Sequence, residues 1–197
     1  MQLTTANKIT ISRMLMVPLF VLALLAYTGT GKDLHRWLAI GIFFVAAVGD
    51  GVDGWVARRF NQRTEMGALL DPLADKLLLV LALVILSLDN GVRLDRIPLW
   101  LTIIVLGREV MLLVLLVLVN YQVGQGKVRP HFVGKTATVL QMTCVLWALL
   151  RLNPGWLFWW ALGAAVTTGV SGLLYLRDGV RMLQAPPQKP VPSDPPV

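Results

Sequence analysis

The chain has 197 residues, of which 56% are hydrophobic and 15% are charged, and its mean hydropathy is +0.67. This composition excludes an ordinary soluble domain, and the length is sufficient for several membrane spans. The net charge of +7 would suggest nucleic-acid binding in a soluble protein, but here the basic residues cluster in loops, which fits membrane orientation and contact with anionic lipid headgroups. We therefore expect an integral membrane protein with membrane lipids, and not nucleic acid, as partners.

The N-terminal region combines a short polar, amphipathic segment, which ends near Arg13, with an apolar run from Met14 to about Tyr27. A secretory signal peptide has a similar layout. No clear small-x-small cleavage site follows the run, whereas five more hydrophobic segments do. We therefore interpret the run as a retained first membrane span.

Five further apolar runs follow in the sequence, at about residues 36–57, 67–88, 98–120, 132–150 and 156–175. Each is close to the roughly 20 residues that a helix needs to cross about 30 Å of hydrocarbon. The pattern predicts an all-α, polytopic membrane protein with six transmembrane helices. We expect one membrane domain over residues 1–184, followed by a disordered tail over residues 185–197, because six of these thirteen tail residues are proline.

The distribution of Lys and Arg predicts the orientation of these spans. Six spans place both termini on one face, where eleven Lys and Arg residues lie outside the span interiors, against five on the other face. Short cytoplasmic segments carry the excess of positive charge, so we expect both termini in the cytoplasm. The tryptophans support the same orientation. Six of the seven, all except Trp55, lie near the predicted outer ends of the spans, and the indole ring prefers the membrane interface.

Four carboxylates stand near the predicted cytoplasmic ends of the second and third spans: Asp50, Asp53, Asp71 and Asp75. Charged groups at membrane depth are costly and usually functional. The two pairs have spacings of three and four residues, which places each pair on one helical face. Unpartnered buried anions would not stay ionised, whereas Mg²⁺ held by oxygen ligands would neutralise them and commonly recruits phosphate oxygens as well. The sequence therefore predicts a carboxylate cage for Mg²⁺ or Mn²⁺ and the outline of a phosphoryl-transfer site.

Small and basic residues accompany the four aspartates. Gly54 and Ala57 share the helical face of the first pair, and Gly67 lies one turn before the second pair. Small residues allow a ligand or another helix to approach closely. Arg58 can supply a fixed cation for phosphate oxygens.

The combined pattern, Asp50-x2-Asp53-Gly54-x2-Ala57-Arg58-x8-Gly67-x3-Asp71-x3-Asp75, is similar to the signature of the CDP-alcohol phosphatidyltransferase family, and every motif position is filled. The resemblance extends along most of the chain. Outside the motif, the residues that resemble the bacterial branch making phosphatidylglycerophosphate are Asn7, Thr10, Arg13, Arg108-Glu109, Gly134-Lys135, Gln141, Ser171 and Tyr175.

The resemblance implies a six-helix, usually dimeric membrane enzyme that transfers a phosphatidyl group from CDP-diacylglycerol to glycerol 3-phosphate and releases CMP. It implies a site at the cytoplasmic face of the bacterial inner membrane, with two Mg²⁺ or Mn²⁺ ions. Asp50, Asp53 and Asp71 would bind these ions, and Asp75, the fourth carboxylate of the metal cage, would be the general base. The residues implied at the nucleotide and pyrophosphate site are Asn7, Thr10, Gly54, Ala57, Arg58 and Gly67, and those implied at the acceptor's phosphate are Arg108 and Lys135.

Four alternatives remain open at this level. Ala137 stands where the branch often has a second lysine, which weakens the assignment to glycerol 3-phosphate. The runner-up function is that of a CMP-forming cardiolipin synthase, whose acceptor is phosphatidylglycerol, or of another CDP-alcohol phosphatidyltransferase with a different acceptor. Arg108 and Glu109 would also fit a buried ion pair, and Lys135 an interfacial basic residue. A cation transporter also has intramembrane carboxylates, but these are spread along a path with discontinuous helices, whereas here they collect near one face.

Overall fold

The computed structural model describes the backbone of residues 5–60, 65–88, 94–123 and 132–184. It describes the side chains of residues 15–49, 76–88, 94–119, 121 and 132–183. The expected disordered tail, residues 185–197, lies outside the described residues.

All regular structure in the described ranges is helical, as the sequence predicts. The helices are α1 (Thr5–Thr30), α2 (Asp33–Phe60), α3 (Glu65–Ser87), α4 (Leu99–Val123), α5 (Phe132–Leu150) and α6 (Pro154–Gln184). Each coincides with one of the six apolar runs to within one residue or contains it. The expected amphipathic N-terminal segment and the first span form a single helix from Thr5 onward.

Length and hydropathy identify three of these helices as candidate membrane spans within the described residues. They are Leu99–Val119 of α4, Phe132–Leu150 of α5 and Pro154–Leu183 of α6, and two shorter apolar segments are Leu15–Thr30 and Lys76–Ser87. The chain is therefore a membrane protein. The full set of six spans stays a prediction.

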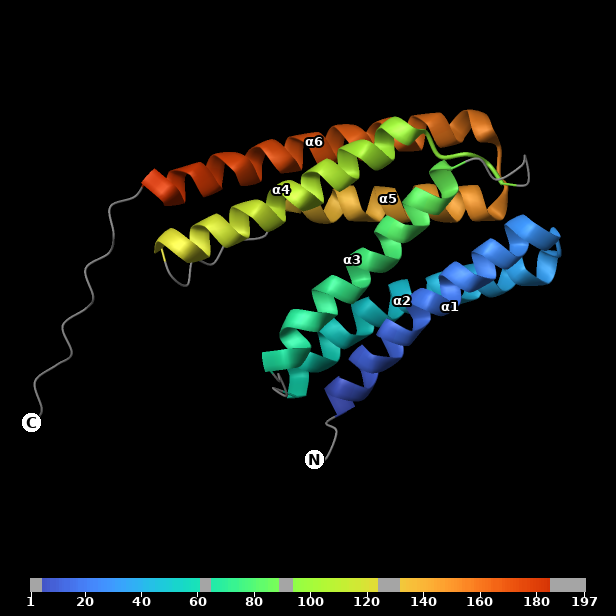
Figure 1. The fold of residues 1–197 in the computed structure, drawn as a ribbon, viewed down its shortest axis with the longest axis horizontal. Helices are drawn as coiled ribbons and strands as arrows, with labels where there is room; N and C mark the ends of the chain where they lie inside the picture. Colours follow the sequence, from blue (N-terminus) through green and yellow to red (C-terminus); the bar gives the residue numbers. More distant parts are fainter. Residues whose placement is uncertain (1–4, 61–64, 89–93, 124–131, 185–197) are drawn as a thin grey trace, which may run out of the picture.

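The helices form two groups that α3 joins (Figure 1). One group contains α4, α5 and α6, in which α6 packs against both of the others, and the second is the pair α1 and α2. α3 crosses between the groups and contacts α1, α2, α4 and α5. A displacement of α3 would therefore change the helix packing in both groups.

The core between the helices is apolar and runs through both groups. Phe20 of α1 and Phe43 of α2 are buried with ring centroids 5.7 Å apart. Leu83 of α3, Leu101 of α4 and Val145 of α5 belong to the same buried cluster. These side chains fix the contacts of α3 with its neighbours.

The connection between α5 and α6 shows why the chain reverses there. Arg151 has a positive φ of 54°, and the N–H of Leu152 donates to the carbonyl of Trp147 at 3.3 Å, which closes the C-terminal turn of α5. Asn153 Oδ1 then accepts a hydrogen bond from the N–H of Gly155 at 2.9 Å. This cap and Pro154 in the first turn start α6, two residues before the start expected from hydropathy.

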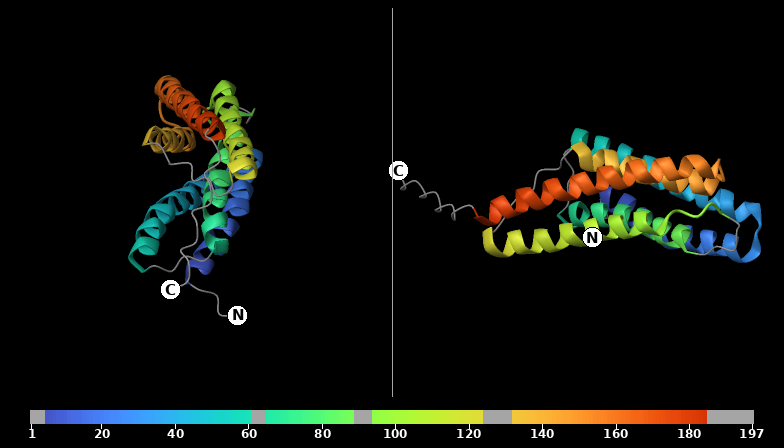
Figure 2. Two further views of the ribbon diagram at one scale, coloured as in Figure 1. Left: turned by 90° about the vertical axis from the view of Figure 1, so that its left-hand side faces the viewer. Right: turned by 90° about the horizontal axis from the view of Figure 1, so that it is seen from above.

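The start of α1, the end of α2 and the start of α3 lie close together, at the lower edge of the molecule in Figure 1 and in the left view of Figure 2. This arrangement follows from the short connections between α1, α2 and α3. It brings together the three helix segments whose sequence carries the aspartate motif and the polar N-terminal residues.

Candidate active site

The backbone of the predicted metal and nucleotide site is helical throughout. Asn7 and Thr10 belong to α1, the residues from Asp50 to Arg58 to α2, and Gly67, Asp71 and Asp75 to α3. The side chains of all ten predicted residues on these segments lie outside the described side chains. Their proposed contacts with metal, nucleotide and one another therefore stay predictions.

The chemistry of the donor set fits a hard divalent cation. All four proposed ligands are carboxylates, and oxygen donors are what Mg²⁺ and Mn²⁺ prefer. Among the side chains that the structure describes, no group of three potential metal ligands occurs, and the aspartates are not among those side chains. The metal site thus rests on residue type and helical spacing.

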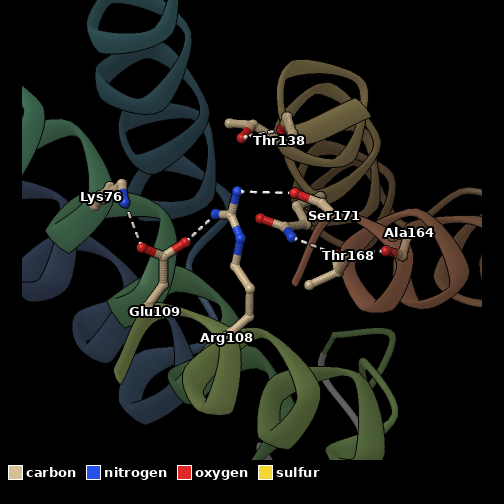
Figure 3. A network of polar contacts seen from close by, with 9 residues as sticks. Lys76, Arg108, Glu109, Thr138, Ala164, Thr168 and Ser171 are labelled. Carbon is tan, nitrogen blue, oxygen red and sulfur yellow. Dashed lines mark hydrogen bonds and ion pairs between the residues drawn. The ribbon is translucent and has the colours of Figure 1, made fainter. Parts of the chain in front are cut away.

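A charged cluster begins one residue after the motif. Glu109 of α4 stands between two cations: its Oε2 accepts from Lys76 Nζ of α3 at 2.5 Å, and its Oε1 accepts from Arg108 Nη1 (Figure 3). Lys76 is 51% exposed, whereas Glu109 and Arg108 are 15% and 9% exposed. The cluster therefore extends from a half-exposed ammonium to a largely buried guanidinium.

The guanidinium of Arg108 is held on several sides. Its Nη2 donates to Ser171 Oγ of α6 at 3.3 Å, and its Cζ lies 5.7 Å from the ring centroid of Tyr175, a cation–π arrangement. Arg108 Nε is buried and has no hydrogen-bond partner among the described residues. These contacts fix the orientation of the guanidinium, and its Nε remains available as a hydrogen-bond donor.

Gly134 near the start of α5 is required for this arrangement. A Cβ at this position would lie 3.2 Å from Arg108 Nη2, from Ser171 Oγ and from the Tyr175 hydroxyl. Such contacts are tighter than ordinary van der Waals packing, so a side chain would displace at least one of these groups. A glycine therefore lets α5 approach the cluster closely.

A small cleft lies beside the cluster. Its polar lining comes from Lys76, Glu109, Thr138 and Gln141, with Leu79, Val80 and Val105 as its apolar wall. Gln141 Nε2 donates to Thr168 Oγ1 at 2.7 Å, and Thr168 Oγ1 donates to the carbonyl of Ala164 at 2.6 Å (Figure 3). These hydrogen bonds tie Gln141, which lines the cleft, to α6.

The two predicted acceptor residues differ in their surroundings. Arg108 lies inside the cluster and does form the ion pair that was the alternative reading of its sequence position. Lys135 is exposed in the first turn of α5. Ala137, where the bacterial branch often has lysine, is fully buried.

Sequence reasoning missed Lys76 and the bridging position of Glu109. Two signals were available: Lys76 directly follows Asp75, and both residues are charged groups within apolar segments. Ser171 and Tyr175 had been noted only as matches to the family pattern, and their contacts with Arg108 give them a defined place.

Comparison with known proteins identifies the chain. Residues 3–169 match the CDP-alcohol phosphatidyltransferase family. A CMP-forming cardiolipin synthase from Streptomyces coelicolor is 34% identical over 191 residues, which cover 93% of this chain and 86% of that protein. A CDP-diacylglycerol–glycerol-3-phosphate 3-phosphatidyltransferase from Pseudomonas fluorescens is 36% identical over 177 residues, covering 85% and 82%. A protein of the same name from Escherichia coli K12 is 33% identical over 154 residues, covering 78% and 80%.

These matches extend over most of the chain and over most of each relative. They confirm the resemblance expected from the aspartate motif and leave the cation-transporter alternative without support. The protein is a membrane-bound transferase of phospholipid biosynthesis. The chain therefore belongs to the CDP-alcohol phosphatidyltransferase family.

Proposed function

We propose that the protein transfers the phosphatidyl group of CDP-diacylglycerol to glycerol 3-phosphate, forming phosphatidylglycerophosphate and releasing CMP. The buried guanidinium of Arg108, with its open Nε, supports a phosphorylated acceptor more than any other feature. A fixed guanidinium with a free donor is well suited to a phosphate oxygen. Relatives named for this reaction, such as the one from Pseudomonas fluorescens, support the same choice.

In this proposal the four aspartates have two roles, metal binding and general-base catalysis. Asp50, Asp53 and Asp71, with Asp75 as the fourth carboxylate, would hold two Mg²⁺ or Mn²⁺ ions. Bound ions of this kind neutralise pyrophosphate oxygens and favour an in-line displacement. The acceptor hydroxyl oxygen forms a bond to the phosphorus of the phosphatidyl group, the bond from that phosphorus to the CMP oxygen breaks, and Asp75 takes the hydroxyl proton as general base.

The donor's nucleotide would be bound by the small and polar residues around the motif: Asn7, Thr10, Gly54, Ala57, Arg58 and Gly67. Lys135 would supply a second cation for the acceptor's phosphate. Its place in the first turn of α5, beside Gly134, supports this role, since Gly134 lies against Arg108.

We further propose that six helices span the bacterial cytoplasmic membrane, with both termini and the active site in the cytoplasm. The excess of basic residues in the corresponding loops supports this orientation. Exposed apolar side chains on α4, such as Val110, Leu113 and Val117, support contact with lipid or with a second copy of the chain in a homodimer.

A CMP-forming cardiolipin synthase is the second candidate. It is favoured by the Streptomyces coelicolor relative of that name and by the buried Ala137, where the branch often has lysine. The acceptor in this case would be phosphatidylglycerol, a bulky lipid.

One assay with two acceptors distinguishes the two candidate functions. Purified protein receives CDP-diacylglycerol with either glycerol 3-phosphate or phosphatidylglycerol, and CMP and the lipid product are identified by mass spectrometry. The proposal predicts phosphatidylglycerophosphate from glycerol 3-phosphate. Cardiolipin from phosphatidylglycerol, with no product from glycerol 3-phosphate, would refute it.

A further inference from the structure

We propose that Glu109 is a positioning residue of the acceptor site, which holds Arg108 and Lys76 in place to bind the anionic group of the acceptor. The inference rests on the proposed function in that it concerns the same acceptor. It adds to the site two residues, Glu109 and Lys76, that neither the motif nor the spacing of the sequence assigned.

The carboxylate of Glu109 bridges the two cations of the cluster. Glu109 uses one oxygen for each cation: Oε1 for Arg108 in its own helix and Oε2 for Lys76 in α3 (Figure 3). Two cations held at one place repel each other, and the near-complete burial of Arg108 strengthens this repulsion. A single bridging carboxylate removes most of this repulsion and keeps both side chains at one place.

One donor of Arg108, its Nε, is available for a ligand. Glu109, Ser171 and the Tyr175 ring occupy Nη1, Nη2 and the face of the guanidinium. Nε is buried without a partner among the described residues, on a side chain that is only 9% exposed. Buried donors in native proteins nearly always have partners, so an oxygen of a bound ligand is the group that this donor lacks.

Lys76 lies next in sequence to the proposed general base and lines the cleft. Lys76 lines the cleft together with Glu109, Thr138 and Gln141, and it directly follows Asp75, the proposed general base, in α3. The Lys76–Glu109 pair thus links α3, one residue beyond that base, to the helix that carries Arg108. An acceptor bound by these cations would be held near the group that takes its proton.

The charge of the cluster makes the proposal testable, because two explanations predict opposite signs. Glu109→Gln keeps the shape of the side chain but raises the net charge of the three residues from +1 to +2. If Glu109 only lowered the local positive potential, the variant would bind an anionic acceptor more tightly. If Glu109 positions the cations, the variant will bind it more weakly.

Steady-state kinetics of purified wild type and Glu109→Gln decide between them. We expect the KM for glycerol 3-phosphate to rise about tenfold, the scale of one charge-assisted hydrogen bond, while the KM for CDP-diacylglycerol changes less than about twofold. An unchanged or lower acceptor KM, or an equal rise in both KM values, would overturn the proposal. Asp33→Asn is the matched control, because it removes a carboxylate from the Asp33–Arg36 ion pair of 3.3 Å at the start of α2, and it should change neither KM.

Lys76→Met provides a second test that does not alter a buried side chain. We expect it to raise the acceptor KM severalfold in the wild type and to have little further effect in Glu109→Gln, because coupled residues are not additive. Equal effects in both backgrounds would overturn the link between the two residues. If wild type uses phosphatidylglycerol alone, the proposed function fails, and the same variants measured with that anionic lipid still test the positioning role.

Discussion

Gly134 of α5 lies against Arg108 of α4 with no room for a side chain: an added Cβ would be 3.2 Å from Arg108 Nη2. Gly134→Ala should therefore displace the guanidinium by a few tenths of an ångström without unfolding the protein. We expect the KM for the acceptor to rise about fivefold, equivalent to about 1 kcal/mol. Gly163→Ala is the control, because its Cβ would meet only Leu140 Cδ1 at 3.9 Å. Equal acceptor KM values in the two variants would remove Gly134 from the site.

The contact of Gly179 in α6 with Leu115 in α4 predicts a stability effect. A Cβ on Gly179 would clash with the Leu115 side chain, so Gly179→Ala should lower the unfolding free energy by about 1–3 kcal/mol, as overpacking usually does. Thermal denaturation in detergent measures this change. The loss should nearly vanish in a Leu115→Ala background. Gly169→Ala, inside the same helix, should not destabilise the protein, because its Cβ would meet nothing within 4 Å and alanine favours the helix.

The positions of the helices could be predicted from the sequence, because each apolar run has the length of a membrane span. The expected run 132–150 coincides with α5. The largest differences occur where polar residues continue a helix beyond its apolar part: α1 begins at Thr5, well before Met14, and α6 is described to Gln184, beyond Tyr175. Hydropathy reports where a helix leaves the hydrocarbon and not where its backbone hydrogen bonds end.

The candidate site could be predicted only in part. The spacing of the aspartates is a local property of two helices, so the sequence was sufficient to propose it. The bridge from Lys76 to Glu109 joins residues 33 positions apart, and its existence depends on how α3 crosses α4. The same holds for the contacts of Arg108 with Ser171 and Tyr175 in α6.

Asp95, in the segment before α4, predicts a pH-dependent stability. Burial raises the pKa of this carboxyl above its ordinary value of 3.8, and the positive charge of Arg151 partly opposes the shift. The folded state therefore binds this proton more tightly than the unfolded state does, so the contribution to stability is present below pH 3.8 and is lost as the pH rises through the folded pKa. Asp95→Asn should raise the thermal midpoint at pH 7 and should show a smaller difference from wild type at pH 4. A constant difference at both values would contradict the assignment.

The proposed orientation can be tested by cysteine labelling. In a Cys144→Ala background, a cysteine at Gln62, between α2 and α3, should be protected from an impermeant thiol reagent in intact cells. A cysteine at Asn90, between α3 and α4, should react, because the intervening span places it outside. Both should react after permeabilisation. Labelling at position 62 in intact cells would place the aspartate motif on the wrong face for a cytoplasmic nucleotide product.

The central claim is that the aspartates of α2 and α3 carry a metal-dependent phosphatidyl transfer. Release of CMP from CDP-diacylglycerol and glycerol 3-phosphate by the purified protein, measured before chelation, after chelation and after Mg²⁺ is restored, tests it most directly. We predict loss and full recovery in wild type, no recovery in Asp71→Asn, and in Asp75→Asn a turnover about 10²-fold below wild type, the scale of a lost general base. Full turnover of the wild type in metal-free buffer would contradict the account.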